Sequence, residues 1–225
     1  MNIEINPNLS NNTSKIDYGK QHNIATLQTV KNIITTTLLC LSVIAAQRLD
    51  YFWLENSFDE QSLTELLQAL LLLFSLLCFY QLKRNNYLSS ASVLVSGFFS
   101  VLLIRELDAY FDLILHGSWM YAALIVVFWC VIYALRENNL NDQMSTLLAD
   151  KNMQTLITFI VLLFIFSRLY GMGDFWKAVM GNHYIRDVKN ISEETIELLC
   201  YAFIAFYAHR TKTSLIKSIN IQLAR

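Results

Sequence analysis

The chain has 225 residues and a formal net charge of −1 at pH 7; 55% of its residues are hydrophobic and only 16% are charged. Soluble domains carry about 25% charged residues on average, and the near-zero net charge offers no basic surface to nucleic acid. One proline and six glycines leave few turn-forming residues, so we expect an all-α fold.

The apolar residues gather in long runs, such as the nearly unbroken run over residues 66–79. These runs are apolar on all sides, whereas a helix of a soluble core has one apolar stripe. Because a membrane span needs roughly 20 mostly apolar residues, we predict an integral membrane bundle of six transmembrane helices. The predicted helices cover approximately residues 32–50, 61–82, 88–108, 119–136, 154–172 and 191–209.

The segments around these helices are polar. Residues 1–30 are rich in asparagine and lack the early apolar core of a signal peptide, so we expect a disordered tail. Residues 211–225 form a basic tail. Ser57 with Glu60, and Asn190 with Glu193, have the spacing of capping boxes that begin a helix.

The basic residues predict the orientation in the membrane. If both termini are cytoplasmic, eleven of the 17 Lys and Arg residues fall in cytoplasmic segments, as the positive-inside rule requires. Thirteen of the 18 Asp and Glu residues then fall on the outer side. Acidic residues hardly influence topology, so we interpret their asymmetry as a sign that the outer half of the protein carries its function.

Ionisable side chains form a layer in the outer half of the predicted bundle. At a rise of ~1.5 Å per residue across a core of ~30 Å, five of the six helices place charged groups at similar depth. The exception is residues 119–136, which carry Trp and Tyr but bring no charge to this layer, as expected of a peripheral helix in contact with lipid. Each charge at the bilayer centre costs about 2.5–3.5 kcal/mol, so these groups must face one another or a hydrated cavity.

Helical spacing brings the members of this layer together. Glu194, Glu197 and Tyr201 are three or four residues apart and share one helix face. We expect Arg168 to pair with Glu197, and Arg105 to be spare for an anionic group of a ligand. The predicted ligand-binding residues are Glu65, Gln68, Arg105, Asp108, Asp112, Arg168, Glu194, Glu197 and Tyr201.

Two other interpretations of the layer remain open. Arg48, Arg105 and Arg168 could match three glutamates in a closed ion-pair scaffold, although buried pairs add little net stability. If the helix over 88–108 continues, Asp112 and His116 lie one turn apart on it and form an alternative metal site. The four cysteines are isolated and lack metal-ligand spacing, and no motif identifies a catalytic residue or a cofactor.

Three segments of this layer resemble a loosely defined family of small bacterial inner-membrane proteins that has no assigned activity. They are Glu55 to Gln68, with acids at positions 60 and 65, and the acid-rich runs over residues 105–112 and 193–201. The resemblance covers roughly residues 50–205 and implies a multi-pass protein of the bacterial inner membrane. It offers no catalytic residue to carry over. Membrane hydrolases of the alkaline ceramidase type rely on several histidines, whereas only His116 lies near the layer here.

We therefore expect a binding or transport protein whose outer site takes a small charged ligand, a lipid headgroup or protons. An enzyme acting on a lipid or isoprenoid headgroup is one alternative, and a structural accessory subunit is the other. The expected partners are the lipid bilayer and this ligand, without nucleic acid. The sequence leaves the oligomeric state open.

Overall fold

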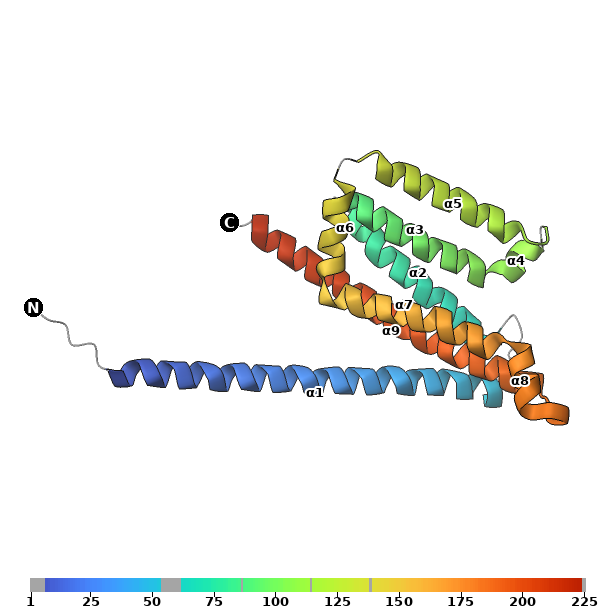
Figure 1. Cartoon of the computed structure of the whole chain (residues 1–225), viewed down its shortest axis with the longest axis horizontal. Helices are drawn as coiled ribbons and strands as arrows, with labels where there is room; N and C mark the ends of the chain where they lie inside the picture. The colour runs from blue at the N-terminus through green and yellow to red at the C-terminus, as the bar shows by residue number, and fades with distance from the viewer. Residues whose placement is uncertain (1–6, 54–61, 86, 114, 138, 224–225) are drawn as a thin grey trace, which may run out of the picture. The chain divides into compact units, whose positions relative to one another are not determined.

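The computed structural model describes residues 7–53, 62–85, 87–113, 115–137 and 139–223, which form helices and no strand (Figure 1). The elements are α1 (Pro7–Trp53), α2 (Leu63–Arg84), α3 (Ser89–Glu106), α4 (Asp108–Asp112), α5 (Ser118–Leu135), α6 (Leu140–Ala149), α7 (Lys151–Gly171), α8 (Gly173–Met180), the 3-10 turn η1 (Gly181–His183) and α9 (Arg186–Leu223). The predicted all-α fold is confirmed for this part of the chain.

Five helical segments are long and apolar enough to cross a membrane, which indicates a membrane protein. They are Thr26–Phe52, Leu63–Arg84, Ser89–Glu106, Ser118–Leu135 and Lys151–Gly171. Each coincides with a predicted span. The sixth predicted span lies within α9, which does not have this apolar character because Glu193, Glu194 and Glu197 interrupt its first half.

Several boundaries differ from the sequence-based expectation. Helix α1 begins at Pro7, well before the expected start near residue 32, and α9 extends to Leu223 through the basic tail. Asn190 lies inside α9 rather than at its start. The capping box at Ser57 lies outside the described residues, but Ser62 caps α2 by accepting a hydrogen bond from the Glu65 backbone N–H at 3.2 Å.

The chain divides into two compact units, residues 1–42 and 43–225. Within the first unit, α1 exposes large apolar side chains such as Leu27, Ile33 and Leu38. In the second unit, α9 packs against α7 and α2, and α3 lies between α2 and α5 (Figure 1). The core of this unit includes the fully buried Phe79 and Phe99, whose stacked rings join α2 to α3 with centroids 5.7 Å apart.

A buried aspartate fixes the start of α2. Asp50 is fully buried and accepts hydrogen bonds from the Leu63 and Thr64 backbone N–H groups at 3.2 and 3.0 Å, and from the Thr64 hydroxyl at 2.7 Å. The first N–H groups of a helix have no partner within the helix, and a carboxylate stabilises that end. Residues 43–53 of α1 are therefore attached to α2 by a cap that sequence patterns did not reveal.

Helix α5 is peripheral, as predicted. It packs mainly against α3, and only Ala123, Cys130 and Ala134 are buried. The closest approach lies at Gly97 of α3, where an added Cβ would be 2.5 Å from the Cys130 Sγ and 3.0 Å from its Cβ. The missing side chain of Gly97 thus allows the two helices to meet.

We predict that Gly97→Ala destabilises the protein. The clash with Cys130 should cost about 1–3 kcal/mol, of which the helix propensity of alanine offsets about 1 kcal/mol. Thermal unfolding in detergent micelles measures the difference. The control is Gly173→Ala, where the nearest atom is the Tyr184 hydroxyl at 4.0 Å. If both variants melt at the wild-type temperature, the contact between α3 and α5 is not tight. Adding Cys130→Ala to Gly97→Ala should recover part of the lost stability, because it removes the sulfur atom that the new Cβ meets.

Candidate ligand site

The acidic face of α9 makes contact with three neighbouring helices. The Glu194 carboxylate accepts a hydrogen bond from the Gln68 amide of α2 at 2.6 Å. One turn later, Glu197 accepts a hydrogen bond from the Ser167 hydroxyl of α7. After a further turn, the Tyr201 hydroxyl donates to the Glu106 carboxylate of α3 at 2.6 Å. The predicted face of α9 is therefore directed into the bundle, where each acid meets a donor.

The ion pairing of Glu197 differs from the prediction. Arg105 of α3 lies 3.8 Å from the Glu197 carboxylate, and 48% of its side chain is exposed against 7% for Glu197. Arg168 makes no ion pair or hydrogen bond with any described residue and is exposed. The expected pair of Arg168 with Glu197, and the expected spare role of Arg105, are both wrong. Ser167 faces α9, and the next residue of a helix points about 100° away, so Arg168 is turned from Glu197.

A cavity of about 380 Å³ lies beside this ion pair, between α3, α7 and the start of α9. Its lining consists of Arg105, Leu163, Phe164, Ser167, Arg168, Gly171 and Glu193. Leu163, Ser167 and Gly171 are four residues apart and form one face of α7. The cavity therefore combines two guanidinium groups with a hydroxyl and an apolar wall.

Glu193 closes one side of the cavity, but its charge is already matched. Its carboxylate accepts a hydrogen bond from the Lys189 ammonium group at 2.7 Å, and this ion pair is mostly buried. Glu193 passes directly over Gly171, since a Cβ there would collide with its Oε1 and approach its Cδ to 2.9 Å. Gly171 thus provides the space in which the Glu193 carboxylate lies.

Gln68 and Glu65 lie on α2, away from the lining of this cavity. Gln68 is fully buried, and its Oε1 has no hydrogen-bond partner among the described residues. Glu65 is half-buried in the first turn of α2. Gln68 borders the acidic face of α9 through its hydrogen bond to Glu194 rather than through Arg105 or Arg168.

Asp108, Asp112 and His116 are not part of the cavity, because α3 ends at Glu106 and the short α4 begins at Asp108. Asp112 accepts hydrogen bonds from the Gly117 backbone N–H and pairs with the His116 Nδ1 at 2.9 Å. The His116 side chain is 96% exposed. No group of three or more His, Cys, Asp or Glu side chains suited to a metal ion occurs among the described residues, so the metal alternative has at most two ligands here.

Of the residues that line the cavity, only Arg105 and Arg168 were predicted as site residues. The prediction missed Leu163, Phe164, Ser167, Gly171 and Glu193, and also Glu106 beside the cavity. Glu106 and Ser167 are direct neighbours of the predicted Arg105 and Arg168 in the chain. The four-residue spacing of Leu163, Ser167 and Gly171 could have predicted this part of the lining, because it places the small residues Ser167 and Gly171 on one face of the helix.

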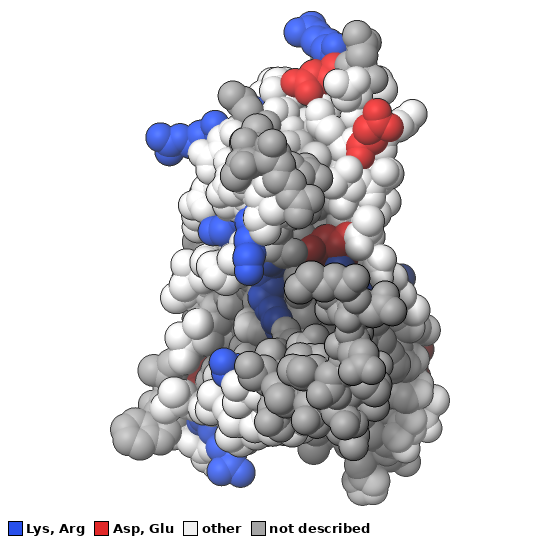
Figure 2. Space-filling view, turned by 90° about the vertical axis from the view of Figure 1, so that its left-hand side faces the viewer, with Lys and Arg blue, Asp and Glu red and all other residues white. Residues whose placement is uncertain are grey.

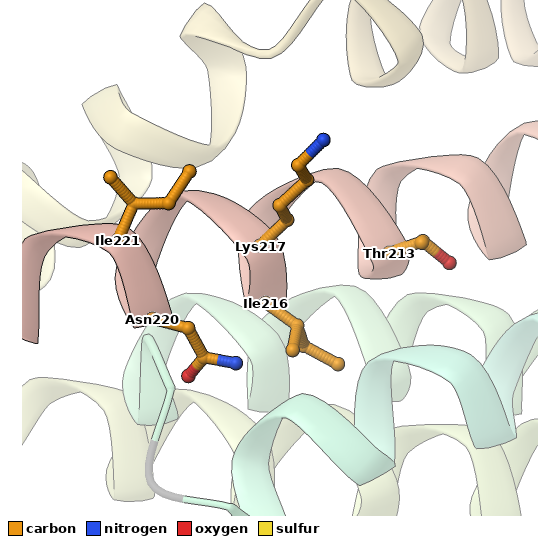
Figure 3. Close-up of a pocket in the computed structure, with 5 residues that line it drawn as sticks. All are labelled: Thr213, Ile216, Lys217, Asn220 and Ile221. Atoms are coloured by element: carbon orange, nitrogen blue, oxygen red, sulfur yellow. The ribbon is translucent and has the colours of Figure 1, made fainter. Parts of the chain in front are cut away.

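A second hollow, of about 460 Å³, lies along the C-terminal part of α9. Its lining is Thr213, Ile216, Lys217, Asn220 and Ile221, all from this one helix, and Lys217 and Asn220 point away from each other (Figure 3). Asn220 already accepts a hydrogen bond from the Tyr87 hydroxyl at 3.1 Å. The side chains do not converge on one point, so the cavity at Arg105 is the better candidate.

Comparison with family models, with curated proteins and with solved structures gave no match to this chain. The resemblance to small bacterial inner-membrane proteins is therefore still an expectation from the sequence. The candidate site is defined by its own geometry.

We predict that Arg105→Gln destabilises the protein because it leaves the buried Glu197 carboxylate without its cation. Fully buried pairs lose about 3–5 kcal/mol when one partner is removed, and the half-exposed Arg105 should contribute less, about 1–3 kcal/mol. The double variant Arg105→Gln/Glu197→Gln should recover stability, as measured by thermal unfolding. Equal melting temperatures for the single and double variants would show that the two residues are not coupled.

Proposed function

We propose that this chain is a membrane protein that binds a small anionic group, a free anion or an anionic headgroup, in the cavity between α3, α7 and α9. The observation that carries this proposal is Arg168, which lines the cavity and has no ion pair among the described residues. A guanidinium group in a concave site with a hydroxyl beside it suits carboxylate or phosphate oxygens.

The charges around the cavity support an anion rather than a cation. Glu193 is matched by Lys189, and Glu197 is matched by Arg105 and also accepts from Ser167. Arg168 is a second guanidinium group in the lining and has no ion pair among the described residues. The nearby Glu106 and Glu194 carboxylates lie outside the lining and accept hydrogen bonds from Tyr201 and Gln68. An anionic group placed between Arg105 and Arg168 would contact both guanidinium groups, and the reduced access of water to the cavity would strengthen both interactions.

Binding fits the cavity better than a continuous transport path does. All of its lining residues lie near the end of α3, the end of α7 or the start of α9, at one end of the bundle. We place this end on the periplasmic side of a bacterial inner membrane, with α9 as a sixth span over about residues 191–209 and both termini in the cytoplasm. The packing of α9 against α2 and α7 supports this span, because the neighbours cover its acids.

The anion site predicts that Arg168→Gln folds normally but loses binding. Phosphate titrated into purified protein should raise the melting temperature, since a ligand at 100 times its Kd stabilises by about 2.7 kcal/mol. Arg168→Gln should remove this shift without lowering the melting temperature of the free protein. Arg168→Lys should keep part of the shift.

The matched control is Lys177→Gln, which removes an exposed cation of α8 that pairs with Asp174. It should keep the full phosphate effect. Short-chain phosphatidic acid in place of phosphate distinguishes a lipid headgroup from a free anion: a larger shift with the lipid, also lost in Arg168→Gln, assigns the headgroup. An Arg168→Gln variant that responds like the wild type to both probes contradicts the proposal.

The proposed topology predicts the activity of fused reporters. A reporter that works only in the cytoplasm should be active after Arg225 and inactive when inserted near Asn182, in the turn η1. The excess of Lys and Arg in the proposed cytoplasmic segments is the physical reason. The opposite pattern would move the anion site to the cytoplasmic face.

A further inference from the structure

Another cavity, of about 240 Å³, lies between α2, α3 and α5, toward the opposite end of the bundle from Arg168. Leu76 of α2 and Val126 of α5 form apolar walls, and Ser96, Gly97 and Ser100 of α3 form a floor of small residues. Trp129, which lines it, is 58% exposed. The cavity is therefore a groove that opens onto the apolar outer surface of the bundle.

One end of this groove carries a cation held by aromatic rings. The Lys83 ammonium group lies 5.7, 5.8 and 5.1 Å from the ring centroids of Tyr80, Trp129 and Tyr133. Rings at these distances attract an ammonium group, so three aromatic side chains from α2 and α5 fix the position of Lys83 at the edge of the groove.

Two more cations lie beside Lys83. Arg84 is the last residue of α2, and Arg136 follows α5 one turn after Tyr133. None of these three cations makes an ion pair with another described residue, while the nearby Glu137 accepts from the Ser90 hydroxyl at 2.7 Å. Figure 2 views the molecule from the side on which α2 and α5 end, where Lys and Arg side chains (blue) are spread over the face together with some Asp and Glu side chains (red).

We propose that this groove binds an anionic phospholipid. One acyl chain lies against Ser96, Gly97 and Ser100, and the phosphate contacts Lys83, with Arg84 and Arg136 near the rest of the headgroup. An apolar groove that opens toward lipid and ends in a basic cluster is complementary to a molecule with a long apolar chain and an anionic head. This site is separate from the cavity at Arg168 and goes beyond the proposed function.

The geometry argues against other occupants. A free anion would gain nothing from the apolar walls. A cation would be repelled by the Lys83 ammonium group, which already lies over the faces of the aromatic rings. A neutral lipid would fill the groove but leave the three cations unmatched. Anionic lipid satisfies both parts of the site.

The test measures lipid binding to purified protein in detergent by native mass spectrometry, with phosphatidylglycerol and phosphatidylcholine of the same chains. Phosphatidylglycerol should bind more tightly. Lys83→Gln should weaken phosphatidylglycerol binding about fivefold, as expected for one basic residue at a membrane surface. It should weaken phosphatidylcholine less, because the choline group offsets the charge of that lipid's phosphate. Lys83→Arg should retain the preference.

Ser100→Leu fills the groove while leaving Lys83 in place, and it should weaken both lipids, whereas Ser100→Ala should not. Lys151→Gln, which removes another exposed cation at the same end of the bundle, should behave like the wild type. Melting temperatures show that each variant is folded. The proposal is overturned if Lys83→Gln binds phosphatidylglycerol as the wild type does, if Lys151→Gln weakens it equally, or if Ser100→Leu keeps full binding. A loss seen only in Arg168→Gln would also overturn it, because the lipid would then occupy the other cavity.

Discussion

The need to satisfy carboxylates inside an apolar bundle determines how the end of the bundle around Glu194 and Glu197 is built. An unpaired buried charge costs several kcal/mol, so each acid on the inner face of α9 requires a donor from a neighbour. Gln68 donates a hydrogen bond to Glu194 and Ser167 donates one to Glu197, while Arg105 forms an ion pair with Glu197. These donors come from α2, α7 and α3, so the acids of α9 require all three helices to pack around it.

Most of these donors are neutral, so the carboxylates are satisfied without using both arginines near the cavity. Gln68 and Ser167 donate hydrogen bonds to Glu194 and Glu197 without adding positive charge, and only Arg105 acts as a cation toward Glu197. Tyr201 of α9 is likewise a neutral donor, to Glu106 of α3. If Arg168 had been the partner of Glu197, the cavity would have been left with a half-exposed Arg105 alone. Instead a second guanidinium group remains at the cavity wall with no partner among the described residues, and the site has room for an anionic group.

Apolar runs and helical spacing were sufficient to locate the apolar parts of the long helices, the peripheral position of α5 and the inward face of α9. These features follow from the number of apolar residues and from helical spacing, which are local properties of the chain. The end of α3 at Glu106 is close to the predicted end at residue 108, but the separate short helix α4 was not predicted, because residues 105–112 contain no proline or glycine. The cap of α2 by Asp50 was also missed, since its partners are 13 and 14 residues away and no local pattern joins them.

The exchange of roles between Arg105 and Arg168 shows where sequence reasoning reaches its limit. Both arginines were correctly expected near the acids of α9, because depth along a helix follows from residue count. Which arginine pairs with Glu197 depends on the rotation of α7 about its axis, and a change of one residue turns a side chain by about 100°. The packing of Leu163 and Ser167 against the bundle sets this rotation, and it is a tertiary property.

Helix α3 contributes to both proposed sites and so connects the two ends of the bundle. Its first half provides the floor of the groove at Gly97, and its last residues provide Arg105 and Glu106 to the acidic face of α9. The close contact of Gly97 with Cys130 and the buried stack of Phe79 on Phe99 leave α3 little freedom to slide. A lipid in the groove can therefore alter anion binding only if it favours a different position of α3, because two sites are coupled only through states that both ligands distinguish. With α3 held this tightly, we expect the groove to stabilise the bundle in which the anion site is formed, rather than to switch that site.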